Sequence, residues 1–211
     1  MNRLPVTHQV PYYAQWESAA LVPQFISGTS AADDPLWQKS GADTREEYAF
    51  WAPRMCGVAC LRMALDFWGH TVPPSVPLLR EAVEAGAYVR HGDQVQGLIY
   101  APFAAFAGRR WGLHAQAVPD LAPERIADEV GAGRLVLLSV HKSIRTLDPD
   151  PPQRGGHLVL AVGVSDTDVL LHNPSGLPGR SQQFAPVPWA HLGRYYAGRG
   201  VILGQHKEIT A

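Results

Sequence analysis

Residues 56–68 read CGVACLRMALDFW, and this stretch determines how the rest of the chain can be organised. Its apolar residues recur at the spacing of one helix face, at Val58, Leu61, Leu65 and Trp68. Gly69 follows directly, and glycine commonly ends a helix. The stretch therefore predicts a helix that begins near Cys56 and buries one side in a core.

Three more stretches have helical patterns, and a glycine follows each of them. They cover residues 75–85, 95–107 and 123 to about 132. Pro102 interrupts the middle stretch, whereas Pro123 stands at a favoured first-turn position of the last one. The front part of the chain is therefore expected to be mainly helical.

Beyond residue 133 the pattern changes to short runs rich in Val and Leu, separated by Gly, Pro, Asp and Ser. These runs predict strands at residues 135–140, 157–164, 169–172 and 201–203. Because helices come first and strands follow, the sequence predicts an α+β fold with a largely antiparallel sheet. It contains no internal repeat and no glycine-rich phosphate loop.

The chain has 211 residues, 46% of them hydrophobic, which suits a single domain over residues 1–211. A net charge of -1, with 18 basic residues spread along the chain, argues against nucleic acid as a partner. No run reaches the ~18 apolar residues of a spanning helix, and the polar start lacks a secretory signal. We therefore expect a cytoplasmic protein without a membrane segment; its oligomeric state is left open.

Residues 17–50 form a polar segment, rich in Ser, Gly, Asp and Pro, around an isolated Trp37. The segment is too long for an ordinary connection between two elements. It is either a functional loop or lid beside a binding cleft or a partly mobile insertion, and the pattern favours neither. Trp16, Trp37 and Trp51 either line a cleft or belong to the core.

The two cysteines, Cys56 and Cys60, lie one helical turn apart and make a poor disulfide pair and an inadequate zinc set. Cys56 falls in the first helical turn, where backbone N–H groups and the helix dipole favour a thiolate and lower the thiol pKa. The alternative is that Cys56 is only a packing residue, as most free cysteines are. Cys60 is expected to point toward the core.

Two further residues are candidates for activating a thiol. His157 opens a predicted strand directly after two glycines, so its ring can approach another element closely. Residues 165–168 are turn formers that fold the neighbouring strands into a hairpin and bring Asn173 near His157. The amide oxygen of Asn173 can then accept the ring N–H and orient the imidazole. Alternatively, His157 is structural and Asn173 belongs only to a turn.

Gln15 is a candidate oxyanion donor, since its side-chain amide could assist the backbone N–H of Cys56. The remaining polar candidates suggest no metal or cofactor site, because no two of them have the paired spacing of metal ligands on a helix. Asp93 is instead expected to cap a following helix. The set considered comprises His91, Asp93, His114, His141, His172 and His191.

These residues resemble the papain-like bacteriocin-processing peptidases, which cut after double-glycine leader sequences, and especially their stand-alone relatives in bacteria. The matching stretches are VPYYAQW, RMCGVACLRMALDFWG, GGHLVLAVGVSDTDVLLHNPSG and VPWAHLGRYYAGRGVIL, in that family's order. The resemblance implies a papain-like fold in which Gln15 is the oxyanion-hole glutamine, Cys56 the nucleophile and His157 the general base. Asn173 stands where the family usually has aspartate. The insertion at about 17–50 and the lack of a transporter segment also depart from it.

The prediction is a cysteine-dependent hydrolase, a peptidase that works through a Cys56–His157–Asn173 triad and an acyl-enzyme intermediate. Its partner is then a peptide or a small acyl or amide substrate. Two alternatives stay open: an acyltransferase or amidase on a specialised small substrate, and a peptide-binding module without turnover.

Overall fold

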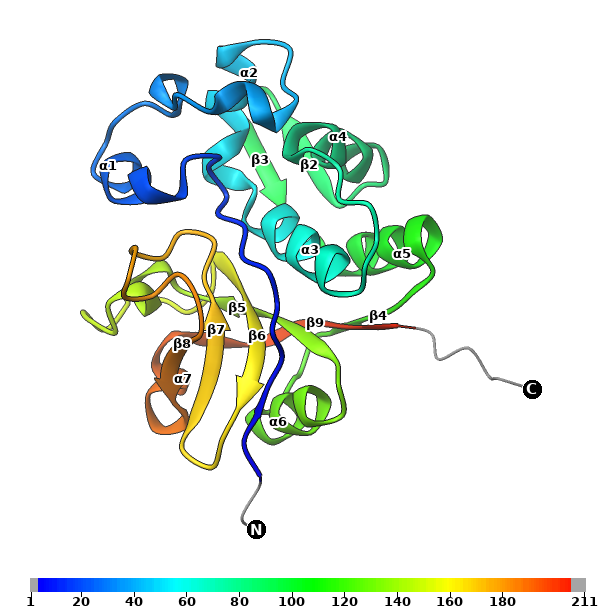
Figure 1. The fold of residues 1–211 in the computed structure, drawn as a ribbon, viewed down its shortest axis with the longest axis vertical. Helices are drawn as coiled ribbons and strands as arrows, with labels where there is room; N and C mark the ends of the chain where they lie inside the picture. Colours follow the sequence, from blue (N-terminus) through cyan, green and yellow to red (C-terminus); the bar gives the residue numbers. More distant parts are fainter. Residues whose placement is uncertain (1–3, 206–211) are drawn as a thin grey trace.

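The computed structural model describes residues 4–205, which form a helical lobe above a sheet lobe (Figure 1). The helical lobe contains five helices and a short hairpin of β2 (Tyr88–His91) and β3 (Gln94–Gly97). The helices are α1 (Val22–Ile26), α2 (Arg45–Trp51), α3 (Cys56–Phe67), α4 (Ser75–Glu84) and α5 (Tyr100–Trp111).

The sheet lobe is a seven-stranded sheet in the order β4-β9-β5-β6-β7-β8, with β1 paired to β6. Every pairing is antiparallel. Helices α6 (Pro123–Gly131) and α7 (Trp189–Tyr195) accompany it. The strands are β1 (Val6–Thr7), β4 (Leu113–Val118), β5 (Leu135–Val140), β6 (His157–Val164), β7 (Asp168–His172), β8 (Ala185–Pro188) and β9 (Tyr196–Gln205).

The sheet separates two apolar cores because alternate residues of a strand face opposite sides. On β6, Leu158 and Leu160 face the core shared with the helical lobe, whereas Val159 and Ala161 face the core with α6 and α7. All eight residues of β6 are buried. The central strand that begins at His157 is therefore held firmly from both faces.

The N-terminal segment joins the two lobes, running from the sheet up to the helices (Figure 1). The backbone N–H of His8 donates to the Val162 carbonyl on β6, at 2.9 Å. Further along, the N–H of Gln15 donates to the Pro174 carbonyl at 3.0 Å, and Trp16 stacks on Phe25. This segment therefore carries Gln15 to the junction of the lobes.

Residues 17–50, expected from sequence to be an insertion, are a packed part of the helical lobe. Val22 and Tyr48 are fully buried in the core shared with the sheet. The fully buried carboxylate of Asp34 accepts hydrogen bonds from the Ser18 N–H and hydroxyl, the Leu36 N–H and the Tyr48 hydroxyl. Four donors on one carboxylate fix the segment to itself and to α2, so it is not a loosely attached insertion.

The structure confirms the α+β class with its antiparallel sheet, and it corrects one helix. The expected helix at 95–107 begins only at Tyr100, and residues 88–97 form the β2–β3 hairpin instead. Asp93 lies in the turn of this hairpin and caps no helix. Pro102 is tolerated because it falls in the first turn, where its missing N–H costs nothing.

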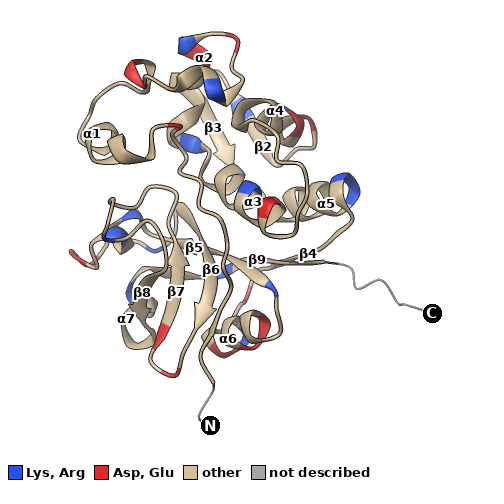
Figure 2. Ribbon diagram, in the orientation of Figure 1, with Lys and Arg blue, Asp and Glu red and all other residues tan. Residues whose placement is uncertain are grey.

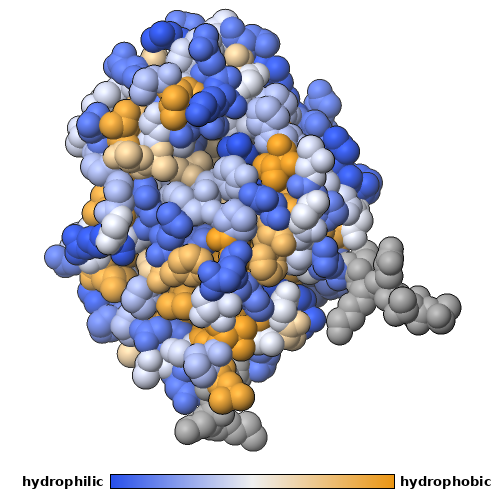
Figure 3. Space-filling view, viewed as in Figure 1, coloured by the Kyte–Doolittle hydropathy of each residue, from blue (hydrophilic) through white to orange (hydrophobic). Residues whose placement is uncertain are grey.

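Charged residues of both signs are scattered over the two lobes (Figure 2). On the face shown in Figure 3, hydrophobic residues lie in small patches separated by hydrophilic ones. Over residues 4–205, no helix is both long and apolar enough to cross a membrane.

Candidate active site

Cys56 is the first residue of α3 and is partly exposed at the junction of the lobes. Its neighbour Gly57 packs tightly: a β-carbon built there would lie 3.1 Å from side-chain atoms of Leu158, Leu98 and Tyr88. Helix α3 therefore approaches the start of β6 closely, which places the Cys56 sulfur beside the backbone N–H of Leu158, the residue after His157.

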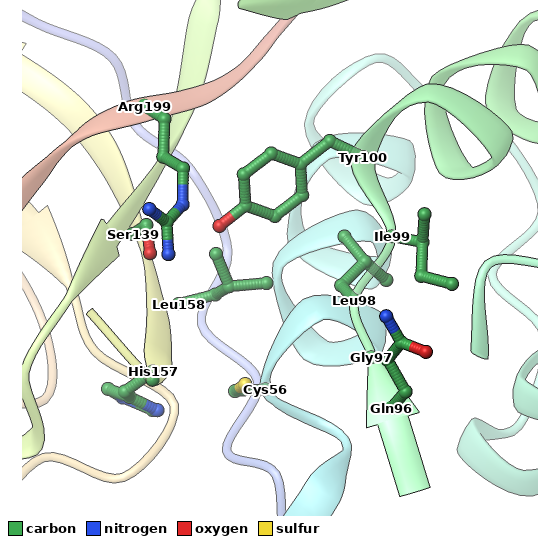
Figure 4. A pocket seen from close by; sticks show the side chains of 11 residues that line it. Cys56, Gln96, Gly97, Leu98, Ile99, Tyr100, Ser139, His157, Leu158 and Arg199 are labelled. Atoms are coloured by element: carbon green, nitrogen blue, oxygen red, sulfur yellow. The ribbon is translucent and has the colours of Figure 1, made fainter. Parts of the chain in front are cut away.

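His157 is the first residue of β6 and is 7% exposed. Gly155 and Gly156 before it both have positive φ angles, of 87° and 92°. A β-carbon at Gly155 would lie 3.1 Å from the Ser139 hydroxyl, so both the backbone angle and the space call for glycine. The close packing at Gly155 and the positive φ angles of both glycines thus set the position from which the imidazole extends toward Cys56 (Figure 4).

Asn173 follows β7 and is hydrogen-bonded to the imidazole of His157. Its Oδ1 lies 2.8 Å from His157 Nε2, and the backbone N–H of Ser175 donates to the same Oδ1 at 3.0 Å. An N–H pointing at this atom identifies it as the amide oxygen, which can only accept. Nε2 therefore carries the proton, and in neutral His157 the lone pair is on Nδ1.

Ser175 and Arg145 complete this arrangement, and the sequence did not single them out. The Ser175 hydroxyl lies 3.1 Å from His157 Nε2 and accepts a hydrogen bond of 2.9 Å from Arg145 Nη2. The signal for Ser175 was present in Asn-Pro-Ser-Gly, because a residue two after asparagine often bonds to its side chain. Arg145 lies 30 residues before Ser175 in sequence, and no local pattern predicts their contact.

Gln15 lies beside the turn that precedes Cys56 and is 5% exposed. Its Nε2 donates to the carbonyl of Ala52 at 3.1 Å, which leaves its second N–H for another acceptor. Its Oε1 is buried and accepts no hydrogen bond from residues 4–205. Gln15 does not line the cavity that contains Cys56 and His157.

That cavity has a volume of about 340 Å³ and lies between the lobes (Figure 4). Cys56 and His157 lie toward one end of it, and Leu158 lies between them and Arg199 (Figure 4). Its remaining lining comes from the end of β3 and the start of α5 on one side and from β5 and β9 on the other: Gln96, Gly97, Leu98, Ile99, Tyr100, Ser139, Gly156 and Arg199. A thiol and an imidazole therefore open into one substrate-sized cavity.

The pKa of Cys56 is raised, not lowered as the helix position alone predicted. Although Cys56 keeps some contact with solvent, burial disfavours the thiolate more than the N–H groups of Leu158, Gly57 and Cys56 favour it. Burial also lowers the pKa of His157 to about 4. The hydrogen bond that His157 donates to Asn173 opposes this shift, and the charge of Arg145 adds to it. Both pKa shifts therefore favour the neutral thiol of Cys56 and the neutral imidazole of His157 near pH 7.

The structure separates the other candidates from this site. Cys60 is fully buried and its sulfur faces the Leu158 carbonyl at 3.9 Å, as expected of a packing residue. Trp37 carries the Arg45 guanidinium over its ring and does not line the cavity. Trp16 and Trp51 belong to the core. Within residues 4–205, no three His, Cys, Asp or Glu side chains form a group suited to a metal ion.

An N-terminal lobe of helices packed on an antiparallel sheet is the fold of papain-like cysteine peptidases. The sequence matches the Peptidase_C39 like family over residues 7–200. Because this match spans most of the chain, the protein belongs to that family of cysteine peptidases. A comparison with curated proteins gave no match.

Solved structures support the fold. A protein described as a C39-like peptidase from Bacillus anthracis is 15% identical, with a TM-score of 0.59; the alignment covers 98% of this chain and 100% of that one. A double glycine motif protease from an AMS/PCAT transporter, in complex with the leader peptide, is 16% identical, with a TM-score of 0.52 and coverage of 95% and 97%. The peptidase domain of Streptococcus ComA is 14% identical, with a TM-score of 0.50 and coverage of 73% and 93%.

Proposed function

We propose that the protein is a cysteine peptidase in which Cys56 is the nucleophile, His157 the general base, Asn173 the orienting residue and Gln15 an oxyanion donor. Membership of a cysteine peptidase family supports the reaction class. One related fold was solved with a leader peptide, which makes peptides the first substrates to test.

The observation that carries the proposal is the hydrogen bond from His157 Nε2 to Asn173 Oδ1, at 2.8 Å, in a cavity that also contains Cys56. This bond leaves Nδ1 as the basic nitrogen, and the lowered pKa keeps it unprotonated near neutral pH. A neutral base is what a neutral thiol requires.

In the proposed reaction, the Cys56 thiol proton passes to His157 Nδ1 while the sulfur attacks the substrate carbonyl carbon. The carbonyl electrons move to the oxygen, which the Cys56 N–H and the second N–H of Gln15 Nε2 stabilise. Collapse of this intermediate expels the amine, which takes its proton from His157. Water then attacks the thioester carbonyl and gives a proton to His157. The C–S bond breaks, His157 returns that proton to the Cys56 sulfur, and a carboxylic acid and the free thiol are released.

The test is to trap the thioester. The protein is mixed with an activated ester such as p-nitrophenyl acetate, or with peptides containing two adjacent glycines, then quenched in acid and mapped by mass spectrometry. We expect the acyl mass on Cys56. Cys56→Ala should carry none, and the matched variant Cys60→Ala should acylate like the parent.

An acyl group on any other residue, or none at all in the folded parent, contradicts the proposal. Adding an amine distinguishes the outcome of the second step. Release to water defines a hydrolase, and transfer to the amine in preference to water defines an acyltransferase.

A further inference from the structure

The end of the cavity away from Cys56 and His157 is cationic. Arg199, Ser139 and Tyr100 gather there, with the Tyr100 hydroxyl turned toward the guanidinium (Figure 4). Ser139 Oγ and Arg199 Nη2 both lie close to Gly155, at 3.1 and 3.4 Å from the position of a β-carbon built on it. The guanidinium and two hydroxyls thus share one small region.

An irregularity in β9 directs Arg199 into the cavity. β5 and β9 pair at Leu138 with Gly200 and at Val140 with Tyr196. Between these pairs β5 has one residue, Ser139, whereas β9 has three, 197–199. Such bulges re-aim side chains at the rims of sheets.

Arg199 has no internal counter-charge. Within residues 4–205 its side chain makes no ion pair or hydrogen bond, and none of the residues that line the cavity is acidic. Other arginines of the chain are paired, for example Arg80 with Asp43 and Glu47. The fork of Arg199 is therefore free to bind a planar anion with two parallel hydrogen bonds.

We propose that Arg199, with Ser139 and Tyr100, forms a subsite for a carboxylate of the substrate, next to the bond that Cys56 attacks. This deepens the proposed function and rests on it. The apolar side chains of Leu98, Ile99 and Leu158 line the cavity and suit the methylene groups that lead to such a carboxylate. An acidic side chain close to the scissile bond fits this arrangement.

The test compares alkylation of Cys56 by paired reagents that differ only in a carboxylate. N-bromoacetyl-glutamic acid α-amide is compared with N-bromoacetyl-glutamine α-amide, and N-bromoacetyl-alanine with its amide. In each case the sulfur forms a bond to the methylene carbon, bromide leaves, and the thiol proton passes to His157 or water. The first pair tests a side-chain carboxylate and the second a terminal one.

Because Arg199 is exposed at the mouth of the cavity, we expect the parent to react with the acid of the glutamic pair roughly 3- to 5-fold faster than with its amide, the scale of a charge pair at an exposed side chain. Arg199→Gln should bring this ratio near one, and Arg199→Lys should retain part of it. Arg109→Gln, at an exposed arginine of α5, makes the same charge change and should keep the parent ratio.

The subsite is overturned if the parent shows an acid-to-amide rate ratio near one for both pairs, or if Arg199→Gln leaves that ratio unchanged. The proposed function survives this outcome as long as the amides still alkylate Cys56. A preference only for the terminal carboxylate, removed by Arg199→Gln, keeps the subsite but overturns the assignment to an acidic side chain. If even the neutral amides label Cys56 no faster than Cys60, the proposed function fails as well.

Discussion

The two sides of the candidate site are built differently. On the sheet side, His157, Asn173 and Ser175 are all at most 7% exposed and are joined by hydrogen bonds that Arg145 extends. On the helical side, Cys56 is partly exposed, and among residues 4–205 the Gln15 side-chain oxygen has no hydrogen-bond partner. The polar groups around His157 are therefore fixed by several hydrogen bonds, whereas Cys56 and Gln15 on the helical side have fewer polar partners.

The largest expected effect is the loss of acyl transfer when either reacting group is removed. Cys56→Ala should form no thioester, and His157→Ala should slow acylation roughly 10²- to 10⁴-fold, the usual scale of general base catalysis. The double variant should be no worse than Cys56→Ala, because members of a catalytic unit fail together. Single-turnover acylation of proteins shown to be folded measures all three, and an active Cys56→Ala protein contradicts the comparison.

A smaller effect is expected where only orientation is lost. Asn173→Ala removes the acceptor for His157 Nε2–H and should slow acylation by roughly 10- to 100-fold. Asn173→Asp keeps an acceptor at the same place and should retain most activity. The pair is compared by single-turnover rates. If Asn173→Ala acylates like the parent, Asn173 is only a turn residue and the site is a dyad.

The helical side should depend on Asp34 for stability. Asp34→Ala leaves four donors without their acceptor, at Ser18, Leu36 and Tyr48, and should lower the free energy of unfolding by about 3 kcal/mol. The neighbouring exposed Asp33→Ala is the matched control. Urea unfolding measures both. Equal stability of the two variants would show that the insertion is not held by this carboxylate.

Deleting residues 18–47 is consequently expected to unfold the protein, not merely to change its selectivity. The deletion removes Val22 and Phe25 from the core shared by the lobes. Thermal unfolding followed by circular dichroism checks this, and a cooperative transition near that of the parent contradicts it.

Acid should destabilise the fold through two buried histidines. Burial lowers the pKa of both His157 and His172 from 6.5 to about 4, so between these values the unfolded chain binds more protons. Stability is therefore full above about pH 6.5 and falls as pH drops toward 4, by up to about 3 kcal/mol for each histidine.

The contribution of His172 to this pH dependence can be measured separately from that of His157. His172 is fully buried between Tyr12 and Phe184, and neither of its ring nitrogens has a hydrogen-bond partner in residues 4–205. His172→Phe should flatten the pH dependence of the unfolding free energy, and His91→Phe on the exposed hairpin should not. Matching slopes for His172→Phe and the parent would remove His172 from this account.

The smallest effect is expected at Ser175. Ser175→Ala removes one of the two acceptors near His157 Nε2 and the partner of Arg145 Nη2, and should slow acylation only about 3- to 10-fold. Ser175→Thr keeps the hydroxyl and should restore the rate. A change in unfolding free energy without any change in the acylation rate would assign Ser175 to folding alone.

The sequence predicted the strands that are buried on both faces better than the exposed or short ones, for physical reasons. Residues 135–140 and 157–164 are buried on both faces, so their apolar runs match the strand bounds. The β2–β3 hairpin is mostly exposed and carries no such run. β4 and β8 alternate buried and exposed residues over few positions, which gives a weak signal.

The residues of the candidate site also differ in how far the local sequence predicts them. Cys56, His157 and Asn173 are recognisable because each stands at the end of a regular element, beside glycine or proline. Arg145 and Arg199 are placed by tertiary packing and by a strand irregularity, which no local pattern encodes. The direction of the Cys56 pKa was also mispredicted, because the helix terminus is visible in sequence and the burial that outweighs it is not.

The most direct test of the central claim measures alkylation of Cys56 and Cys60 by iodoacetamide, residue by residue with mass spectrometry, from pH 5 to 9. The account predicts that Cys56 reacts far faster than buried Cys60, that its rate rises with pH because the thiol pKa is raised, and that His157→Ala slows Cys56 alone. Equal rates for the two cysteines, or a Cys56 rate indifferent to His157→Ala, would contradict it.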